Sequence, residues 1–290
     1  SGVISTGGGV GGGSAGSGAG GGGGAGIVIL RYPTASVASY QLDASSGLDT
    51  TANTAYPIAN TAYYKLEGGS GTTVTDSSGN GNNGVSTSVT YAAGRFGQAA
   101  VFNGTNSTIA TPITTNYSNL SISCWVKFNA LPTGGADATL VSKGFYTSGS
   151  STQYLHLRYE DNLSKGFTFA IRNNSAYNSQ AIAGVNAIIG VWYHVVGTLD
   201  SSGNAQIYVN GAAGTGITGA PSMTNSNAFE IGSFISTSAL LNGSIDQVRI
   251  FNSVISAGNV TSLYNESTVN ESTDGTDSIL QFIGGTGTVT

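Results

Sequence analysis

Acidic side chains are the first place to look for chemistry, because two carboxylates facing one another could hydrolyse a glycosidic bond. The chain offers no strand pattern that carries two such acids. Glu230 stands alone in an apolar segment, and Asp246 is the sole acid of another. Glu160 and Asp161 are adjacent, and in the loop expected there their side chains would diverge. The sequence therefore predicts no catalytic residue and a protein that is not an enzyme.

The two histidines do not change that expectation. A Ser-His-Asp triad would need one of them, and no Gly-x-Ser-x-Gly elbow precedes a helix. His194 lies in the strand-like phrase Trp192-Tyr-His-Val195, where a packing or hydrogen-bonding role is expected. His156 alternates with Leu155 and Leu157, which places it on the polar face of a strand. There it is a candidate contact for a glycan.

A possible metal site begins at Asp76. In Asp76-Ser-Ser-Gly-Asn-Gly81 the first, third and fifth side chains carry oxygen, as at the start of a calcium loop. The twelfth position is Thr87, where an EF-hand needs a bidentate Glu. Asp76 and Asn80 are the candidate ligands, and hard oxygen donors suit calcium rather than zinc. The alternative is a turn in which these side chains cap backbone amides.

Binding of a sugar needs an aromatic platform with planar polar partners. Residues of this kind gather between positions 144 and 186, in the most irregular region of the pattern. A structural role is the alternative for each tyrosine, because the chain has 14 of them and a β-rich protein exposes some. The candidate ligand contacts are Tyr146, Tyr154, His156, Tyr159, Arg172 and Tyr177.

Composition excludes several classes of partner. Only 8% of the 290 residues are charged and the net charge is −5, so the chain lacks the basic face that nucleic acids and polybasic membrane anchoring require. The longest apolar run, Ile27 to Leu30, is far shorter than the ~20 residues of a membrane span. Cys124 is the single cysteine and allows no internal disulfide. With 39% apolar residues, a packed domain is expected instead of charge-driven disorder.

From about Thr54 the sequence alternates with period two, and clusters of Gly, Asn and Ser recur every 8 to 15 residues. This pattern predicts an antiparallel β-sandwich. In Leu120-Ser-Ile-Ser-Cys-Trp-Val-Lys-Phe128 the apolar residues share one face, while Trp125 points the other way and is expected to pack under a loop. Only Ser256 to Tyr264 looks helical. The other predicted strands are Ala99 to Asn103, Thr139 to Lys143, Tyr154 to Tyr159, Phe167 to Arg172, Trp192 to Leu199, Gln206 to Val209, Phe229 to Gly232 and Ile245 to Phe251.

The order of several phrases adds a resemblance. The phrases are Ala62-Tyr-Tyr-Lys-Leu-Glu-Gly68, Asp76-Ser-Ser-Gly-Asn-Gly-Asn-Asn-Gly84, Gly94-Arg-Phe-Gly97, Ala100-Val-Phe-Asn-Gly104, Leu120-Ser-Ile-Ser-Cys-Trp-Val126, Trp192-Tyr-His-Val195, Ile207-Tyr-Val-Asn-Gly211 and Gly243-Ser-Ile-Asp-Gln-Val-Arg-Ile-Phe251. Over roughly residues 54 to 268 the chain resembles the laminin-G-like, concanavalin A-like jelly-roll family. The resemblance implies a two-sheet module that binds glycans or proteins. It also implies calcium as a candidate cofactor, with Asp76 and Asp246 as the acids that match the family.

The chain ends carry a second pattern. Residues 7 to 26 contain 14 glycines, which cannot form a core by themselves, and we expect them to pack against other copies of the chain. The apolar segments Ile27 to Tyr32 and Ile279 to Ile283 are predicted to pair with neighbouring subunits by strand addition. A Gly-rich lead of this kind resembles fibre and appendage proteins of marine bacteriophages. The predicted organisation is a Gly-rich assembly segment (1–33), a spacer (34–53), the sandwich (54–268) and a C-terminal strand or linker (269–290).

Together these features predict an all-β, two-sheet antiparallel jelly-roll sandwich preceded by a Gly-rich extended segment. The leading function is a non-enzymatic fibre or appendage subunit of a phage virion, exposed on the virion or outside a cell. Its expected partners are other copies of itself and surface glycans. One alternative is a secreted bacterial adhesin or filament subunit, and another is a carbohydrate-binding module of a larger enzyme.

Overall fold

The chain forms two compact units in the computed structural model. One is Thr54–Tyr264, and the other joins Ser1–Asn53 to Asn265–Thr290. The structure describes the backbone of residues 4–6, 28–33, 48–49, 57–68, 71–145, 152–161, 165–173, 178–235, 239–273 and 277–283. It describes side chains for 57–68, 71–145, 152–161, 165–173, 179–235 and 239–266. None of the helices within these ranges has the length and apolar character needed to cross a bilayer.

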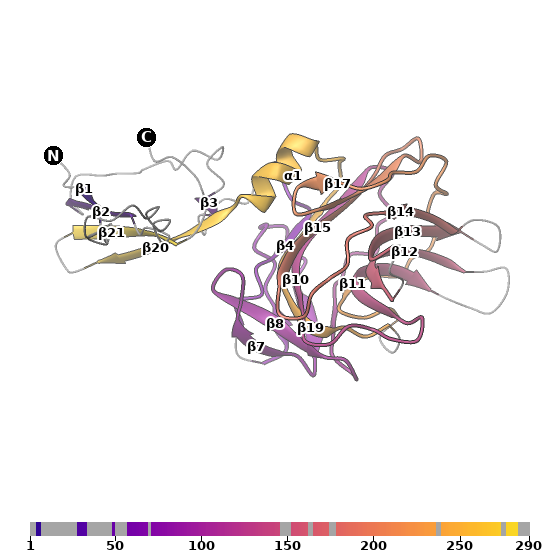
Figure 1. Cartoon of the computed structure of the whole chain (residues 1–290), viewed down its shortest axis with the longest axis horizontal. Coiled ribbons are helices and arrows are strands. Elements are labelled where there is room, and N and C mark those ends of the chain that lie inside the picture. Colours follow the sequence, from indigo (N-terminus) through magenta and orange to yellow (C-terminus); the bar gives the residue numbers. More distant parts are fainter. Residues whose placement is uncertain are drawn as a thin grey trace, which may run out of the picture. The chain divides into compact units, whose positions relative to one another are not determined.

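Two antiparallel sheets stack face to face in the larger unit (Figure 1). Sheet I has the order β17 (Ala212–Ala213), β16 (Ala205–Val209), β15 (Trp192–Leu199), β10 (Leu120–Phe128), β19 (Asn242–Phe251), β8 (Gln98–Asn103) and β7 (Thr90–Ala93), and β4 (Ala62–Tyr64) also pairs with β19. Sheet II has the order β14 (Asn178–Ile182), β13 (Phe167–Asn173), β12 (Gln153–Glu160), β11 (Asp137–Phe145), β18 (Phe229–Ile231), β9 (Thr108–Ala110), β6 (Gly84–Thr87) and β5 (Thr73–Val74). The predicted all-β sandwich is confirmed.

The core lies between the two sheets and follows from the alternation of the strands. On β10 the predicted apolar face, from Leu120 to Phe128, is buried in one large cluster with side chains of β12 and β13. The sheets approach closely at Gly197 of β15, where an added Cβ would lie 2.7 Å from the Phe169 ring of β13. A side chain at position 197 would therefore push the two sheets apart.

The predicted helix is α1 (Ala257–Tyr264). Ser256 caps its N-terminus, because the Ser256 Oγ accepts a hydrogen bond from the Asn259 N–H at 3.1 Å. Val260 and Leu263 bury one side of the helix against Phe251 of β19. The helix thereby covers part of the outer face of sheet I.

An Asn-Gly turn joins β16 to β17. Asn210 and Gly211 both have positive φ, 51° and 81°, as a tight hairpin turn requires. The Asn210 Oδ1 also accepts a hydrogen bond from the His194 N–H at 2.9 Å. The residue therefore serves both the turn and the neighbouring strand β15.

Replacing Asn210 by Ala should lower the free energy of unfolding by about 1–2 kcal/mol. Ala is strained at positive φ, and it cannot accept the hydrogen bond from the His194 N–H. Replacing it by Gly keeps the backbone conformation and should lose only the hydrogen bond, a smaller cost. Urea unfolding of both variants measures the difference. Equal losses in the two variants would contradict a role for the backbone conformation.

The smaller unit contains a five-stranded sheet of order β1 (Ile4–Thr6), β2 (Val28–Pro33), β21 (Asp277–Ile283), β20 (Ser267–Thr273) and β3 (Leu48–Asp49). Strand β2 pairs antiparallel with β21 of the same chain, with Val28 opposite Phe282. The expectation that these two segments pair with neighbouring subunits is therefore wrong for this structure. An intramolecular partner is available because β21 folds back on β20 as a hairpin and presents its other edge to β2. The Gly-rich stretch 7–26 lies outside the described residues.

Candidate functional site

Strand β12 places a row of polar side chains on the outer face of sheet II. Its odd-numbered residues from Leu155 to Tyr159 belong to the core cluster. The alternate residues therefore point outward, since successive side chains of a strand face opposite ways. These are Tyr154, His156, Arg158 and Glu160. Glu160 was expected in a loop, but it is the last residue of the strand and pairs with Asp137 of β11.

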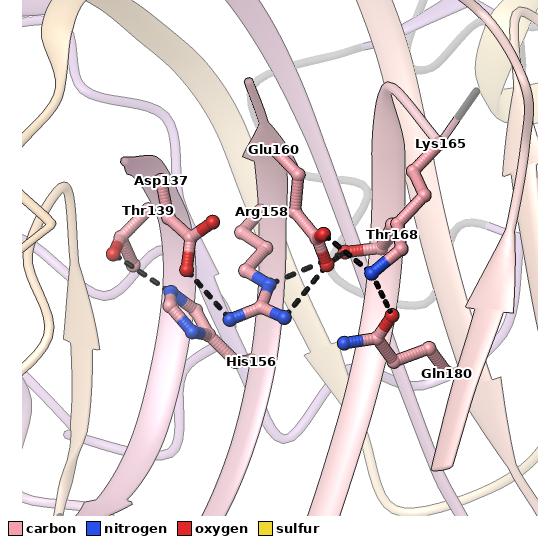
Figure 2. Close-up of polar contacts among 8 residues, drawn as sticks. All are labelled: Asp137, Thr139, His156, Arg158, Glu160, Lys165, Thr168 and Gln180. Atoms are coloured by element: carbon pink, nitrogen blue, oxygen red, sulfur yellow. Dashed lines mark hydrogen bonds and ion pairs between the residues drawn. The ribbon is translucent and has the colours of Figure 1, made fainter. Parts of the chain in front are cut away.

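Arg158 lies at the centre of a hydrogen-bonded group that we call the Arg158 network (Figure 2). Its two terminal nitrogens each bind one carboxylate, the Asp137 Oδ2 and the Glu160 Oε1, both at 2.7 Å. The Lys165 Nζ binds the Glu160 Oε2 and the Gln180 Oε1, both at 2.9 Å. The network consists of Asp137, Arg158, Glu160, Lys165, Thr168 and Gln180, which come from β11, β12, β13, β14 and the turn before β13.

Burial and pairing act on the two carboxyls in opposite ways. Burial raises the pKa of Asp137, and the neighbouring Arg158 only partly offsets this effect. Burial would also raise the pKa of Glu160, but the ion pairs with Lys165 and Arg158 bring it below its usual value. Arg158 and Glu160 are each only 8% exposed, so water screens their ion pair little. The network is therefore a fixed polar surface held by short charge-assisted bonds.

Tyr154 and His156 lie on the same outer face but are covered. The Phe234 ring stacks on His156 with centroids 5.0 Å apart and meets Tyr154 edge-on at 5.5 Å. The His156 Nε2 shares a hydrogen bond of 2.8 Å with the Thr139 Oγ1. Burial, with a contribution from Arg158, holds the pKa of His156 well below its usual value. The expected exposed position of His156 is corrected, because the segment after β18 lies over it.

The remaining predicted ligand contacts fall in three different places. Tyr159 points into the core, where its ring packs 5.2 Å from Phe128, so it cannot be part of an exposed platform. Arg172 lies on β13, two positions beyond Ala170 on the outer face of sheet II, and is half-buried. Tyr146 and Tyr177 lie outside the described residues. Among the six, Arg172 alone is described with an accessible side chain.

The outer face of sheet I carries a second buried polar group. Trp125 packs under the 94–97 turn as expected: the Arg95 guanidinium lies 4.7 Å from its ring centroid, and Tyr264 of α1 stacks at 5.8 Å. His194 binds the Ser123 Oγ at 2.8 Å, and burial lowers its pKa to about 3. Asp246 accepts a bond from the Phe96 N–H at 2.9 Å, and burial raises its pKa to about 8. This group secures the turn and the helix.

The predicted calcium ligands do not form one donor set. The Asp76 carboxylate accepts the N–H groups of Tyr63, Ser78 and Asn82, each at 2.9 Å. Asn80 donates to backbone carbonyls through its Nδ2, and Asp246 contacts the 94–97 turn instead. No group of three or more His, Cys, Asp or Glu side chains suited to a metal occurs among the described residues. Asp76 thus has the geometry of the Asx-turn alternative, and the three residues do not fit a shared calcium ion.

What the Arg158 network can do chemically follows from its bonds. Both carboxylates are occupied by one guanidinium, so neither is free to act as a nucleophile towards a sugar carbon. Planar amide, guanidinium and carboxylate groups can instead exchange hydrogen bonds with hydroxyls of a ligand lying on the sheet. Sequence reasoning missed Asp137, Lys165 and Gln180. The alternation along β12 was a readable signal for Arg158 and Glu160.

Comparisons with known proteins agree with this architecture. The family model described as the concanavalin A-like lectin/glucanases superfamily matches residues 103–261. Domain 4 of the arabinanase AbnA of Geobacillus stearothermophilus, in complex with arabinotriose, is similar at 24% identity and a TM-score of 0.59, over 71% of this chain and 98% of that one. A search of curated proteins finds no match.

Two larger proteins contain the same fold. The sialidase of Trypanosoma rangeli is similar at 17% identity and a TM-score of 0.52, over 70% of this chain and 32% of that one. The binding domain of botulinum neurotoxin serotype G is similar at 19% identity and a TM-score of 0.55, over 71% of this chain and 50% of that one. At these identities the similarity shows the fold alone. Because the family model spans more than half of the 290 residues, the chain belongs to the concanavalin A-like lectin/glucanase superfamily.

Proposed function

We propose that the sandwich is a non-enzymatic carbohydrate-binding module that uses the outer face of β11 to β14. The observation that carries this proposal is the Arg158 network, a row of charged and amide groups held by 2.7–2.9 Å bonds on one sheet face (Figure 2). Lys165, with 30% of its side chain exposed, and Gln180 offer groups to a ligand at the open side of the row. Arg172 extends the same face towards the far end of β13.

The absence of a free carboxylate in the network supports binding over turnover. A glycosidase needs one carboxyl to donate a proton and a second to attack the sugar or activate water. Here Asp137 and Glu160 both bind Arg158, and Glu160 also binds Lys165. A sugar on this face would meet a neutralised surface, which suits recognition of hydroxyl groups.

We propose further that the module belongs to a structural fibre or appendage protein of a phage virion, where it faces outward or contacts neighbouring copies. The 14 glycines between residues 7 and 26 and the low charge of the chain support packing against other copies. A secreted adhesin or filament subunit would use the same features. The similarity over 98% of an arabinanase domain favours the remaining alternative, a carbohydrate-binding module of a larger enzyme.

A glycan array that includes arabinan oligosaccharides tests the binding function with the whole chain. We expect at least one glycan to be retained, and Gln180→Ala to weaken its binding about tenfold, the effect of ~1.4 kcal/mol. Val85→Ala, at an exposed position of β6, is the control that should bind as the wild type does. Failure of the wild type to retain any glycan, or release of shortened sugar products by the chain alone, would overturn the proposal.

A different measurement tests which kind of protein or assembly the module belongs to. Electron microscopy of native particles should show repeated copies of the chain in a fibre or appendage. Discovery of the chain as one copy beside a catalytic domain would instead establish the enzyme-module alternative.

A further inference from the structure

A small pocket lies at one end of the sandwich, away from the Arg158 network in the fold. It has a volume of about 160 Å³. Its walls come from three loops: the one between β9 and β10, the one between β15 and β16, and the one between β17 and β18. The residues that matter for its chemistry are Asn116, Tyr117, Asp200, Pro221, Ser222 and Met223. We call it the loop-end pocket.

Hydrogen bonds hold the loops of this pocket in place. Lys143, a buried residue of β11, donates from its Nζ to the Thr114 carbonyl at 2.7 Å and to the Asn227 carbonyl. The Asn116 Nδ2 donates to the Asn225 carbonyl at 2.7 Å, which joins the first loop to the third. A ligand would therefore meet walls that are already ordered, and ordering costs little on binding.

The third loop also forms hydrogen bonds with the second loop and with sheet II. The Ala220 N–H donates to the Gly203 carbonyl at 2.9 Å, and the Asn173 Nδ2 at the end of β13 donates to the Ser222 carbonyl at 2.8 Å. All three loops are thus connected to one another or to a strand. The pocket is a built feature of the fold and not a gap between independent loops.

The lining combines an apolar surface with one carboxylate. Tyr117 and Met223 pack against the core with part of their surface exposed, and Pro221 adds a further apolar group. Asp200 accepts the N–H groups of Ser202 and Asn204 at 2.8 and 2.9 Å. Hydrogen bonds from Asn204 lower the pKa of Asp200, which is therefore ionised at neutral pH. Its carboxylate can accept further hydrogen bonds.

We infer that the loop-end pocket binds a single neutral sugar residue, with the C–H face of the ring on Tyr117 and Met223 and hydroxyl groups donating to Asp200. The volume is well below the ~300–1,000 Å³ of drug-sized sites, so one ring fits and an extended chain does not. None of the described residues lining the pocket is Lys, Arg or His, and Asp200 repels a carboxylated sugar. The inference rests on the proposed carbohydrate-binding function and adds a separate site to it.

The chain provides its own reporter, because Met223 is its single methionine. Labelling the methionine methyl group with ¹³C gives one NMR signal, located in the pocket. Titration of the whole chain with a panel of methyl glycosides, including arabinofuranoside, galactopyranoside and glucopyranoside, should move this signal saturably for at least one neutral sugar. N-acetylneuraminic acid and glucuronic acid should leave it unmoved.

Variants separate this pocket from the sheet face. Tyr117→Ala should abolish the saturable shift, while the same substitution at Tyr91, on the edge strand β7, should preserve it. A Met223 signal that no neutral sugar moves, while the array retains a glycan, would overturn the pocket and leave the proposed function standing. If no sugar moves the Met223 signal and the array retains no glycan, both the pocket and the proposed carbohydrate-binding function are overturned. A shift caused only by the acidic sugars would overturn the assignment of the pocket to neutral sugars.

Discussion

Replacing Arg158 by Met should lower the free energy of unfolding by about 3–5 kcal/mol, because it leaves the buried Glu160 and the partly exposed Asp137 without their guanidinium. Asp137 and Glu160 each lose a charge-assisted bond of 2.7 Å. Lys165 remains as a partner of Glu160, whereas among the described residues Asp137 forms an ion pair with Arg158 alone. Urea unfolding monitored by tryptophan fluorescence measures the loss.

A compound variant identifies the cause of that loss. Adding Asp137→Asn and Glu160→Gln to Arg158→Met removes the unpaired charges and should recover most of the lost stability. Arg172→Met removes an arginine from the same sheet face outside the network and is the matched control, for which a change of less than about 1 kcal/mol is expected. An Arg158→Met protein as stable as the wild type would show that the network contributes no more than surface pairs do.

Much of the sandwich could be predicted because alternation along a strand is a local property. The segments 120–128 and 192–199 were predicted to the residue, since one face of each must be apolar to form the core. The turn at Asn210-Gly211 was equally readable, because few residue types accept positive φ at two successive positions. These signals need no knowledge of which strands are neighbours.

The candidate site required that knowledge and was therefore largely missed. Arg158 meets Asp137 because β11 pairs with β12, and Lys165 meets Gln180 because β13 lies between β12 and β14. The residues come from segments up to 43 positions apart, and no local pattern specifies their register. Alternation correctly placed His156 on the outer face of β12, but it could not show that Phe234, from a distant loop, covers the imidazole ring.

The stability of the larger unit should be greatest near pH 6.5 and should fall on both sides, because its buried acid and its buried histidines titrate in opposite directions. Burial raises the pKa of Asp246 from 3.8 to about 8, so the folded state holds its proton more tightly than the unfolded state does. The stability that this proton contributes is fully present below pH 4 and is lost as the pH rises to 8.

The histidines give the opposite slope. Burial lowers the pKa of His194 from 6.5 to about 3, and the pKa of His156 is lowered for the same reason. Their contribution is fully present above pH 6.5 and is lost as the pH falls, because the unfolded chain takes up protons that the folded chain cannot accept. Between pH 4 and 6.5 two histidines oppose one carboxyl, so stability still rises with pH, and above pH 6.5 the carboxyl acts alone.

Two variants dissect this profile. Asp246→Asn should remove the decline between pH 6.5 and 8, which is worth about 2 kcal/mol for one proton over this interval. His194→Gln, whose amide can still bond to Ser123, should flatten the slope between pH 4 and 6.5 by leaving one histidine against one carboxyl. Urea unfolding at a series of pH values measures both slopes independently of any constant loss of stability in a variant. A wild-type stability that rises steadily from pH 6.5 to 8 would show that Asp246 is ionised in the folded protein and would contradict this prediction.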